Sequence, residues 1–145
     1  MSSYLNIYLI PRKEHMPEQK PLFLMQWSRS SEIYQAIRNA ANPTFIGTGD
    51  KTNYSDLTKD DLDEAIESIQ NTIKSCRKRI QARVEALNKI SNPPKETLDE
   101  FIQDNIDTSD YITELEETKS DLYALRNIIA DIQYSDFEKV VCNID

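Results

Sequence analysis

Apolar residues recur in alternating steps of four and three along the middle of this 145-residue chain. Such spacing predicts one long helix, over about residues 58–91, with an apolar seam that packs on another helix. At a rise of 1.5 Å per residue this helix is about 50 Å long. Thr58 and Asp61 resemble a capping box at its start, and Asn92-Pro93-Pro94 ends it. The seam is Leu62, Ile66, Ile69, Ile73, Cys76, Ile80, Arg83, Leu87 and Ile90.

A second seam with the same steps follows in the last third of the chain. It predicts a helix from about Thr108 or Ser109 to Gln133, preceded by a separate short helix over residues 95–103. The connection over residues 92–108 is short, which favours an antiparallel helical hairpin. The members of this seam are Tyr111, Leu115, Thr118, Leu122, Leu125, Ile129 and Ile132.

Each seam contains one polar residue within the apolar series, Arg83 in the first and Thr118 in the second. Folding the helices back on each other places these two residues at about the same level. We therefore predict a structural polar layer there that fixes the register of the hairpin. The guanidinium is expected within reach of Glu114, Glu117 or Asp121.

The two ends of the chain predict a small sheet. Residues 4–10 and 22–27 are rich in β-branched, aromatic and leucine residues, and they predict two antiparallel strands. Residues 138–142 predict a C-terminal strand that joins them, and a short helix is expected over residues 31–41. The fold class is therefore α+β, a small antiparallel sheet with a short helix and a long projecting antiparallel hairpin. We expect a single domain over 1–145, made of parts 1–56, 57–133 and 134–145.

Charge is unevenly distributed in this protein, whose net charge is −8. Residues 1–54 carry six Lys/Arg and four Asp/Glu, residues 55–91 seven of each, and residues 92–145 four and fourteen. The acidic excess argues against general nucleic-acid binding. Two cysteines give no disulfide framework, and the apolar start of the chain is too short for a membrane span. A soluble, cytoplasmic protein with no membrane partner is expected.

The first candidate binding site is an anion site at the start of the predicted short helix. Arg29, Ser30 and Ser31 combine a guanidinium, two hydroxyls and a helix N-terminus. Tyr34 and Arg38 continue one face of that helix and extend the site with an aromatic surface. The alternative interpretation is ordinary helix capping by the serines and an exposed arginine.

A second candidate is the basic cluster Lys74, Arg77, Lys78, Arg79 and Arg83 on the first long helix. Arginine forks match phosphate oxygens, so Arg77 and Lys78 are candidate ligand-binding residues. The alternative is pairing with the acidic run Glu114, Glu116, Glu117 and Asp121 of the neighbouring helix. Lys78 lies far from the seam and is the exception to that pairing.

Catalysis, metals and cofactors have little support in the sequence. The single histidine, His15, has no marked nucleophile or base beside it. Gly47-Thr48-Gly49-Asp50 lacks the strand, helix and lysine of a phosphate-binding loop, so a plain loop is expected. No catalytic residue, metal ligand or cofactor is assigned, and a hydrolase built on scattered carboxylates is the weakest interpretation.

Two N-terminal segments resemble short uncharacterised proteins encoded by bacteriophages of gut bacteria. These are Ser3-Tyr4-Leu5-Asn6-Ile7-Tyr8-Leu9-Ile10-Pro11 and Ser28-Arg29-Ser30-Ser31-Glu32-Ile33-Tyr34-Gln35, within the first third of the chain. The resemblance implies a viral protein that works in a bacterial cytoplasm or in a virion. It transfers no activity and no functional residue.

Two functions follow as hypotheses. The first is a non-enzymatic homo-oligomer that acts through protein–protein contacts, as an assembly component or as an inhibitor of a host protein. Two helices bury only one stripe of each other, and residues such as Phe45 and Phe101 need further cover. The alternative is an oligomeric small-ligand binder that sequesters an anionic signalling nucleotide.

Overall fold

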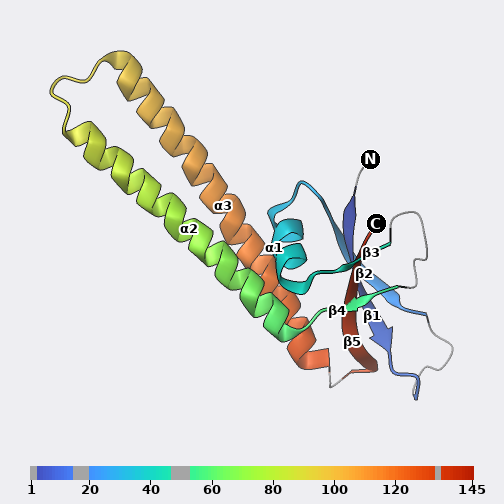
Figure 1. The fold of residues 1–145 in the computed structure, drawn as a ribbon. Coiled ribbons are helices and arrows are strands. Elements are labelled where there is room, and N and C mark those ends of the chain that lie inside the picture. The colour runs from blue at the N-terminus through green and yellow to red at the C-terminus, as the bar shows by residue number, and fades with distance from the viewer. Residues whose placement is uncertain (1–2, 15–19, 47–52, 133–134) are drawn as a thin grey trace.

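Both ends of the chain build the sheet of this protein (Figure 1). A computed structural model describes residues 3–14, 20–46, 53–132 and 135–145. The central strand β1 pairs antiparallel with β2 on one side and with β5 on the other, as predicted. Two short strands also pair with β5, β3 in parallel and β4 antiparallel, so the sheet is mixed. The strands are β1 Tyr4–Pro11, β2 Leu22–Ser28, β3 Thr44–Phe45, β4 Ser55–Asp56 and β5 Phe137–Ile144.

Three helices complete the fold, α1 Glu32–Ala41, α2 Lys59–Asn88 and α3 Lys95–Asp131. The two long helices form the predicted antiparallel hairpin, and most of its length projects away from the sheet (Figure 1). The short helix α1 lies between the hairpin and the sheet, and it packs on both long helices (Figure 1). The α+β class with a long helical hairpin is confirmed.

The core forms where α1 and the lower part of the hairpin pack on the sheet. We call this region the body, and it contains α2 up to Cys76 and α3 from Thr108 onward. The seam residues Leu62, Leu115 and Leu122 are fully buried, which is the burial that their spacing predicts. Fully buried residues of the other elements include Leu5, Ile7, Ile37 and Cys142.

Helix α3 is one continuous helix, and the predicted break between residues 103 and 108 is wrong. Asp104, Asn105 and Asp107 are weak helix formers, but each costs well under about 1 kcal/mol, and residues 95–131 contain no glycine or proline. The Thr108 hydroxyl also donates to the Asp104 carbonyl at 2.8 Å within the helix. The hairpin connection is therefore residues 89–94, where Asn92 takes the left-handed conformation at φ 50°.

The capping box at the start of α2 is confirmed, and it gives a first testable prediction. The Thr58 hydroxyl accepts from the Asp61 amide at 3.3 Å, and the Asp61 carboxylate accepts from the Thr58 amide at 2.9 Å. Thr58→Ala is expected to lower the free energy of unfolding by about 1 kcal/mol in urea titrations. The control is Thr113→Ala, because Thr113 is exposed inside α3 and bonds only to the Ser109 carbonyl among described contacts. An equal loss in both variants would contradict a capping role.

Candidate functional site

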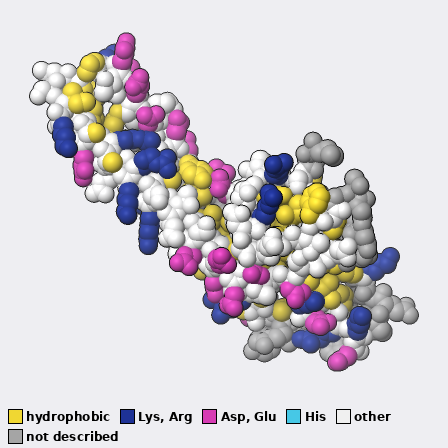
Figure 2. Space-filling model, in the orientation of Figure 1, with side chains coloured by type: hydrophobic (Ala, Val, Ile, Leu, Met, Phe, Trp, Pro, Cys, Tyr) yellow, Lys and Arg dark blue, Asp and Glu magenta, His cyan; other side chains and the backbone are white. Residues whose placement is uncertain are grey.

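A pocket of about 320 Å³ lies at one end of the body, between α1 and the ends of the strands. Three of the residues predicted for an anion site, Arg29, Tyr34 and Arg38, line it. The anion-site residues therefore meet around a hollow in the surface, although Arg29 follows β2 and the other two belong to α1. Figure 2 shows basic and hydrophobic side chains next to one another over α1.

Tyr34 forms a rigid wall of this pocket. Only 2% of the residue is exposed, and its hydroxyl lies 3.1 Å from the Ser3 hydroxyl. The Ser3 hydroxyl donates to the Asp145 carbonyl at 2.9 Å, so it accepts from the Tyr34 hydroxyl. The Tyr34 proton is thereby used within the protein, and its oxygen remains an acceptor.

The two arginines make the pocket positive. Both side chains are exposed, and neither has an ion pair with any carboxylate in the described part of the chain. The side chain of Asp145, which follows the lining residue Ile144, is directed to the sheet. Its carboxylate oxygens accept from the Tyr4 amide at 3.1 Å and from the Asn6 side chain at 3.3 Å.

The serines of the predicted anion site have a different role. Ser31 is the N-cap of α1, since its hydroxyl accepts from the Tyr34 amide at 3.3 Å and donates to the Ser28 carbonyl at 2.7 Å. The hydroxyls of Ser30 and Ser28 lie 3.0 Å apart. Neither Ser30 nor Ser31 lines the pocket, and the capping interpretation is confirmed for Ser31.

Phe45 is the lining residue that sequence patterns did not assign to a site. It lies on β3 and is 72% exposed, the largest exposure among the exposed large hydrophobic residues of the described chain. It reaches the pocket because β3 pairs in parallel with β5, which places Phe45 opposite Ile144. Asn42 and Pro43 lie between α1 and this strand and also line the pocket. The only available signal was an aromatic residue two positions after a helix-ending Pro43.

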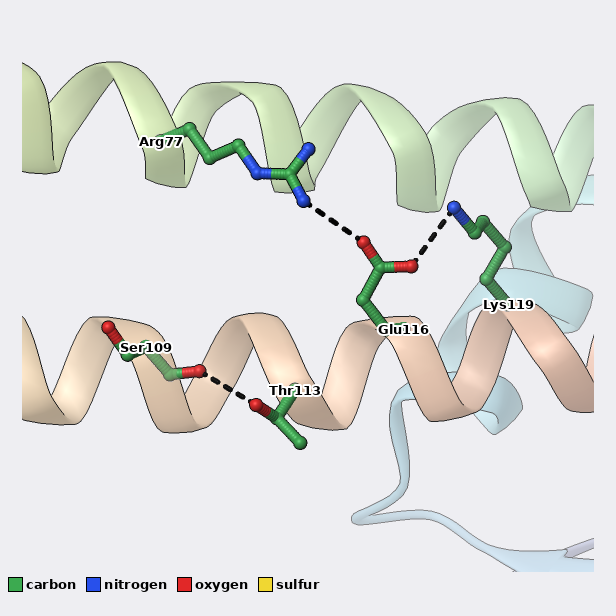
Figure 3. Close-up of polar contacts among 5 residues, drawn as sticks. All are labelled: Arg77, Ser109, Thr113, Glu116 and Lys119. Atoms are coloured by element: carbon green, nitrogen blue, oxygen red, sulfur yellow. Dashed lines mark hydrogen bonds and ion pairs between the residues drawn. The ribbon is translucent and has the colours of Figure 1, made fainter.

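The basic cluster on α2 does not reach this pocket. Arg77 pairs with Glu116 of α3 at 3.2 Å, and Lys119 pairs with the same carboxylate at 3.0 Å (Figure 3). These contacts hold the pKa of Glu116 below its usual value, with the hydrogen bond from Lys119 as the largest cause. Pairing with the acidic run is confirmed for Arg77. Lys78 is exposed and has no ion pair among the described residues.

The polar layer of the hairpin has a different partner from the predicted one. Arg83 donates to the Thr108 hydroxyl at 2.8 Å and to the Asp104 carbonyl at 3.1 Å. Thr118 is ten residues, or about 15 Å, further along α3, and its hydroxyl donates to the Glu114 carbonyl instead. The prediction of an Arg83–Thr118 layer is wrong because α3 begins at Lys95 rather than near Ser109, which changes the register of the two helices.

The remaining candidate chemical groups give no assembled reaction site in the described residues. Burial raises the pKa of the Cys142 thiol to about 12, with Asp61 and Asp56 adding to the effect, so this thiol stays protonated at neutral pH. Within residues 3–14, 20–46, 53–132 and 135–145, no three His, Cys, Asp or Glu side chains are grouped to hold a metal ion. His15 and Gly47-Thr48-Gly49-Asp50 lie outside the described residues.

No described helix combines the length and the apolar character needed to cross a membrane. Comparison of the chain with protein-family models, with curated proteins and with solved structures finds no match.

Proposed function

We propose that this protein is a non-enzymatic assembly protein that binds a second copy of itself through the projecting part of its hairpin. We call residues 77–107 the arm. One observation carries the proposal, since no residue from 77 to 107 is buried although the whole segment is described. The arm nevertheless contains large apolar side chains, among them Val84, Ile90, Leu98, Ile102 and Ile106, which are 36–54% exposed.

The apolar residues Val84 and Ile102 lie on the same side of the arm. Val84 is one heptad after Arg77, and Ile102 is two heptads before Glu116. Residues a whole number of heptads apart lie on nearly the same face of a helix. Because Arg77 and Glu116 pair across the hairpin, the faces that carry Val84 and Ile102 are also adjacent. This side of the arm, with Leu98 close by, is the surface that a partner would cover.

Charge complementarity favours a second copy as that partner. Residues 77–89 carry five Lys/Arg and one Glu, whereas residues 95–107 carry one Lys and five Asp/Glu. Figure 2 shows most of the acidic side chains along one edge of the arm, and most of the basic ones along its middle and its other edge. Among the ion pairs of the described chain, only that of Arg77 involves a side chain of the arm. A surface with equal and opposite halves is complementary to itself.

The charges also select one arrangement of the two arms. With a two-fold axis parallel to the arms, α2 of each copy packs on α3 of the other, and opposite charges meet. An axis across the arms would place α2 on α2 and α3 on α3, where like charges repel. We therefore propose a four-helix bundle with both arms pointing the same way.

Sedimentation equilibrium tests the assembly. The full chain, of mass 16.8 kDa, is expected to sediment as a dimer. The double variant Val84→Asp/Ile102→Asp is expected to be monomeric, with dimerisation weakened roughly 100-fold or more, because each buried unpaired carboxylate costs several kcal/mol.

Tyr123→Asp is the matched control, because Tyr123 is also a large exposed apolar residue at 41% and lies on α3 outside the arm. Its dimerisation should match that of the unmodified chain. A monomeric unmodified chain, or equal loss in the control, would overturn the proposal. Binding of the arm to a different, host-derived protein is the function that a stable monomer would favour.

A further inference from the structure

We infer that the pocket lined by Arg29, Tyr34, Arg38 and Phe45 binds a mononucleotide. The two guanidinium groups hold its phosphate, and the Phe45 ring stacks on its base. This inference is independent of the arm, because none of the residues that line the pocket belongs to the hairpin.

The two arginines indicate a phosphate group. Arginine side chains present planar forks that match phosphate oxygens, and charge-assisted bonds of this type are the strong ones. In a protein of net charge −8, two arginines beside one hollow would be expected to attract carboxylate partners. No carboxylate of the described residues pairs with either, and the nearby Asp145 is already hydrogen-bonded to β1. As far as the described residues are concerned, both guanidiniums therefore remain available to an anion from solution.

Phe45 indicates that the anion carries an aromatic ring. A phenylalanine that is 72% exposed beside a pocket leaves most of its ring open to a flat partner. Stacking of a nucleobase on such a ring stabilises complexes without strong base preference. Asn42 lines the same pocket, and an asparagine amide has both donors and an acceptor that can bond to the edge of a base. Tyr34 adds a fixed wall to the pocket.

The size of the pocket and the charge of the protein restrict the ligand to a single nucleotide. A volume of about 320 Å³ lies at the lower limit of small-molecule sites, which suits a mononucleotide better than a dinucleotide. The net charge of −8 also opposes binding of a polynucleotide, whose many phosphates are repelled by the protein as a whole. The ligand that satisfies both limits is a free nucleoside monophosphate.

Isothermal titration calorimetry on the full chain tests the inference. Adenosine, guanosine, cytidine and uridine monophosphates are the first probes, and at least one is expected to bind. Inorganic phosphate and the corresponding nucleoside are each expected to bind more than tenfold more weakly than the monophosphate. Inorganic phosphate lacks the base that stacks on Phe45, and the nucleoside lacks the phosphate that the arginines hold. A 5′-phosphorylated tetranucleotide distinguishes a free nucleotide from the end of a nucleic acid, and tighter binding of this probe would overturn the inference.

Variants of the pocket residues complete the test. Arg29→Gln, Arg38→Gln and Phe45→Ala are each expected to weaken binding of the nucleotide roughly tenfold, from lost charge-assisted bonds or stacking. All three side chains are exposed, so the fold should be retained, and circular dichroism checks this. The matched controls are Arg79→Gln on α2 and Phe23→Ala on β2, both exposed and outside the pocket, which should leave affinity unchanged. Absence of binding by all four monophosphates, or equal losses in the controls, would refute a nucleotide site.

Discussion

Reversing the charge of one half of the arm is expected to turn the proposed dimer into a monomer, and mixing the two reversed variants is expected to restore a dimer. In the proposed bundle each reversed half would face a half of the same sign. Four cross-copy pairs at roughly 0.5 kcal/mol each correspond to about 2 kcal/mol, or about 30-fold in the dissociation constant. Native mass spectrometry of the separate and mixed variants measures the effect. The basic-half variant is Lys78→Glu/Lys89→Glu, on α2 and its C-cap, and the acidic-half variant is Asp99→Lys/Asp110→Lys on α3, all exposed residues at the outer edges of the two helices.

A mixture of the basic-half variant with the unmodified chain distinguishes the two possible axes. If α2 packs on α3 of the partner, this mixed dimer is weaker than the unmodified dimer, because one of its two charge contacts is repulsive. If α2 packed on α2, the mixed dimer would be stronger than the unmodified one. The effect of salt on the dissociation constant also distinguishes the two axes, because added salt weakens attractive charge contacts and relieves repulsive ones. Tighter dimerisation of the unmodified chain at high salt would contradict the proposed axis.

The long helices were predictable because their signal is local and repeated. Eight of the seam positions lie on α2 and six on α3, and the buried members among them, such as Leu62 and Leu122, lie in the core. The start of α3 was not predictable in the same way. Residues 104–108 have low intrinsic helix propensity, but contacts across the hairpin, including the bond from Arg83 to Thr108, stabilise the helix there. The register of α2 against α3 depends on such contacts across the hairpin. Counting residues from the predicted helix ends therefore could not identify the partner of Arg83.

The residues of the pocket also fall into two groups. Local sequence patterns place some of them, and contacts between distant parts of the chain bring in the others. Tyr34 and Arg38 share a face of α1 because they are four residues apart, and Arg29 lies just before that helix. Phe45 joins them only through the pairing of β3 with β5, about a hundred residues further along the chain. Ser3 joins them beside the β1–β2 pair, where its carbonyl accepts from the Arg29 amide at 2.9 Å. No periodicity in the sequence specifies a two-residue parallel strand such as β3. The residues on and just before α1, Arg29, Tyr34 and Arg38, were therefore predictable, and Phe45 was not.

Shortening a seam leucine is expected to have very different effects in the body and in the arm. Leu122 is fully buried, so Leu122→Ala should lower the free energy of unfolding by about 3 kcal/mol and the melting temperature by roughly 10 °C. Leu87 occupies the equivalent seam of α2 inside the arm but is only partly buried, so Leu87→Ala should cost less than about 1 kcal/mol in dilute, monomeric protein. Thermal unfolding monitored by circular dichroism measures both.

Measuring the stability loss of both variants at several protein concentrations tests whether a second copy covers the arm. If a second copy covers the arm, Leu87 becomes more buried in the dimer, and the loss caused by Leu87→Ala should grow as concentration rises, because dimerisation stabilises the folded state by mass action. The loss caused by Leu122→Ala should stay constant, since its surroundings belong to one chain. Equal losses for the two variants at low concentration would mean that the arm is as closely packed as the body. Its exposed apolar residues would then no longer indicate a missing partner.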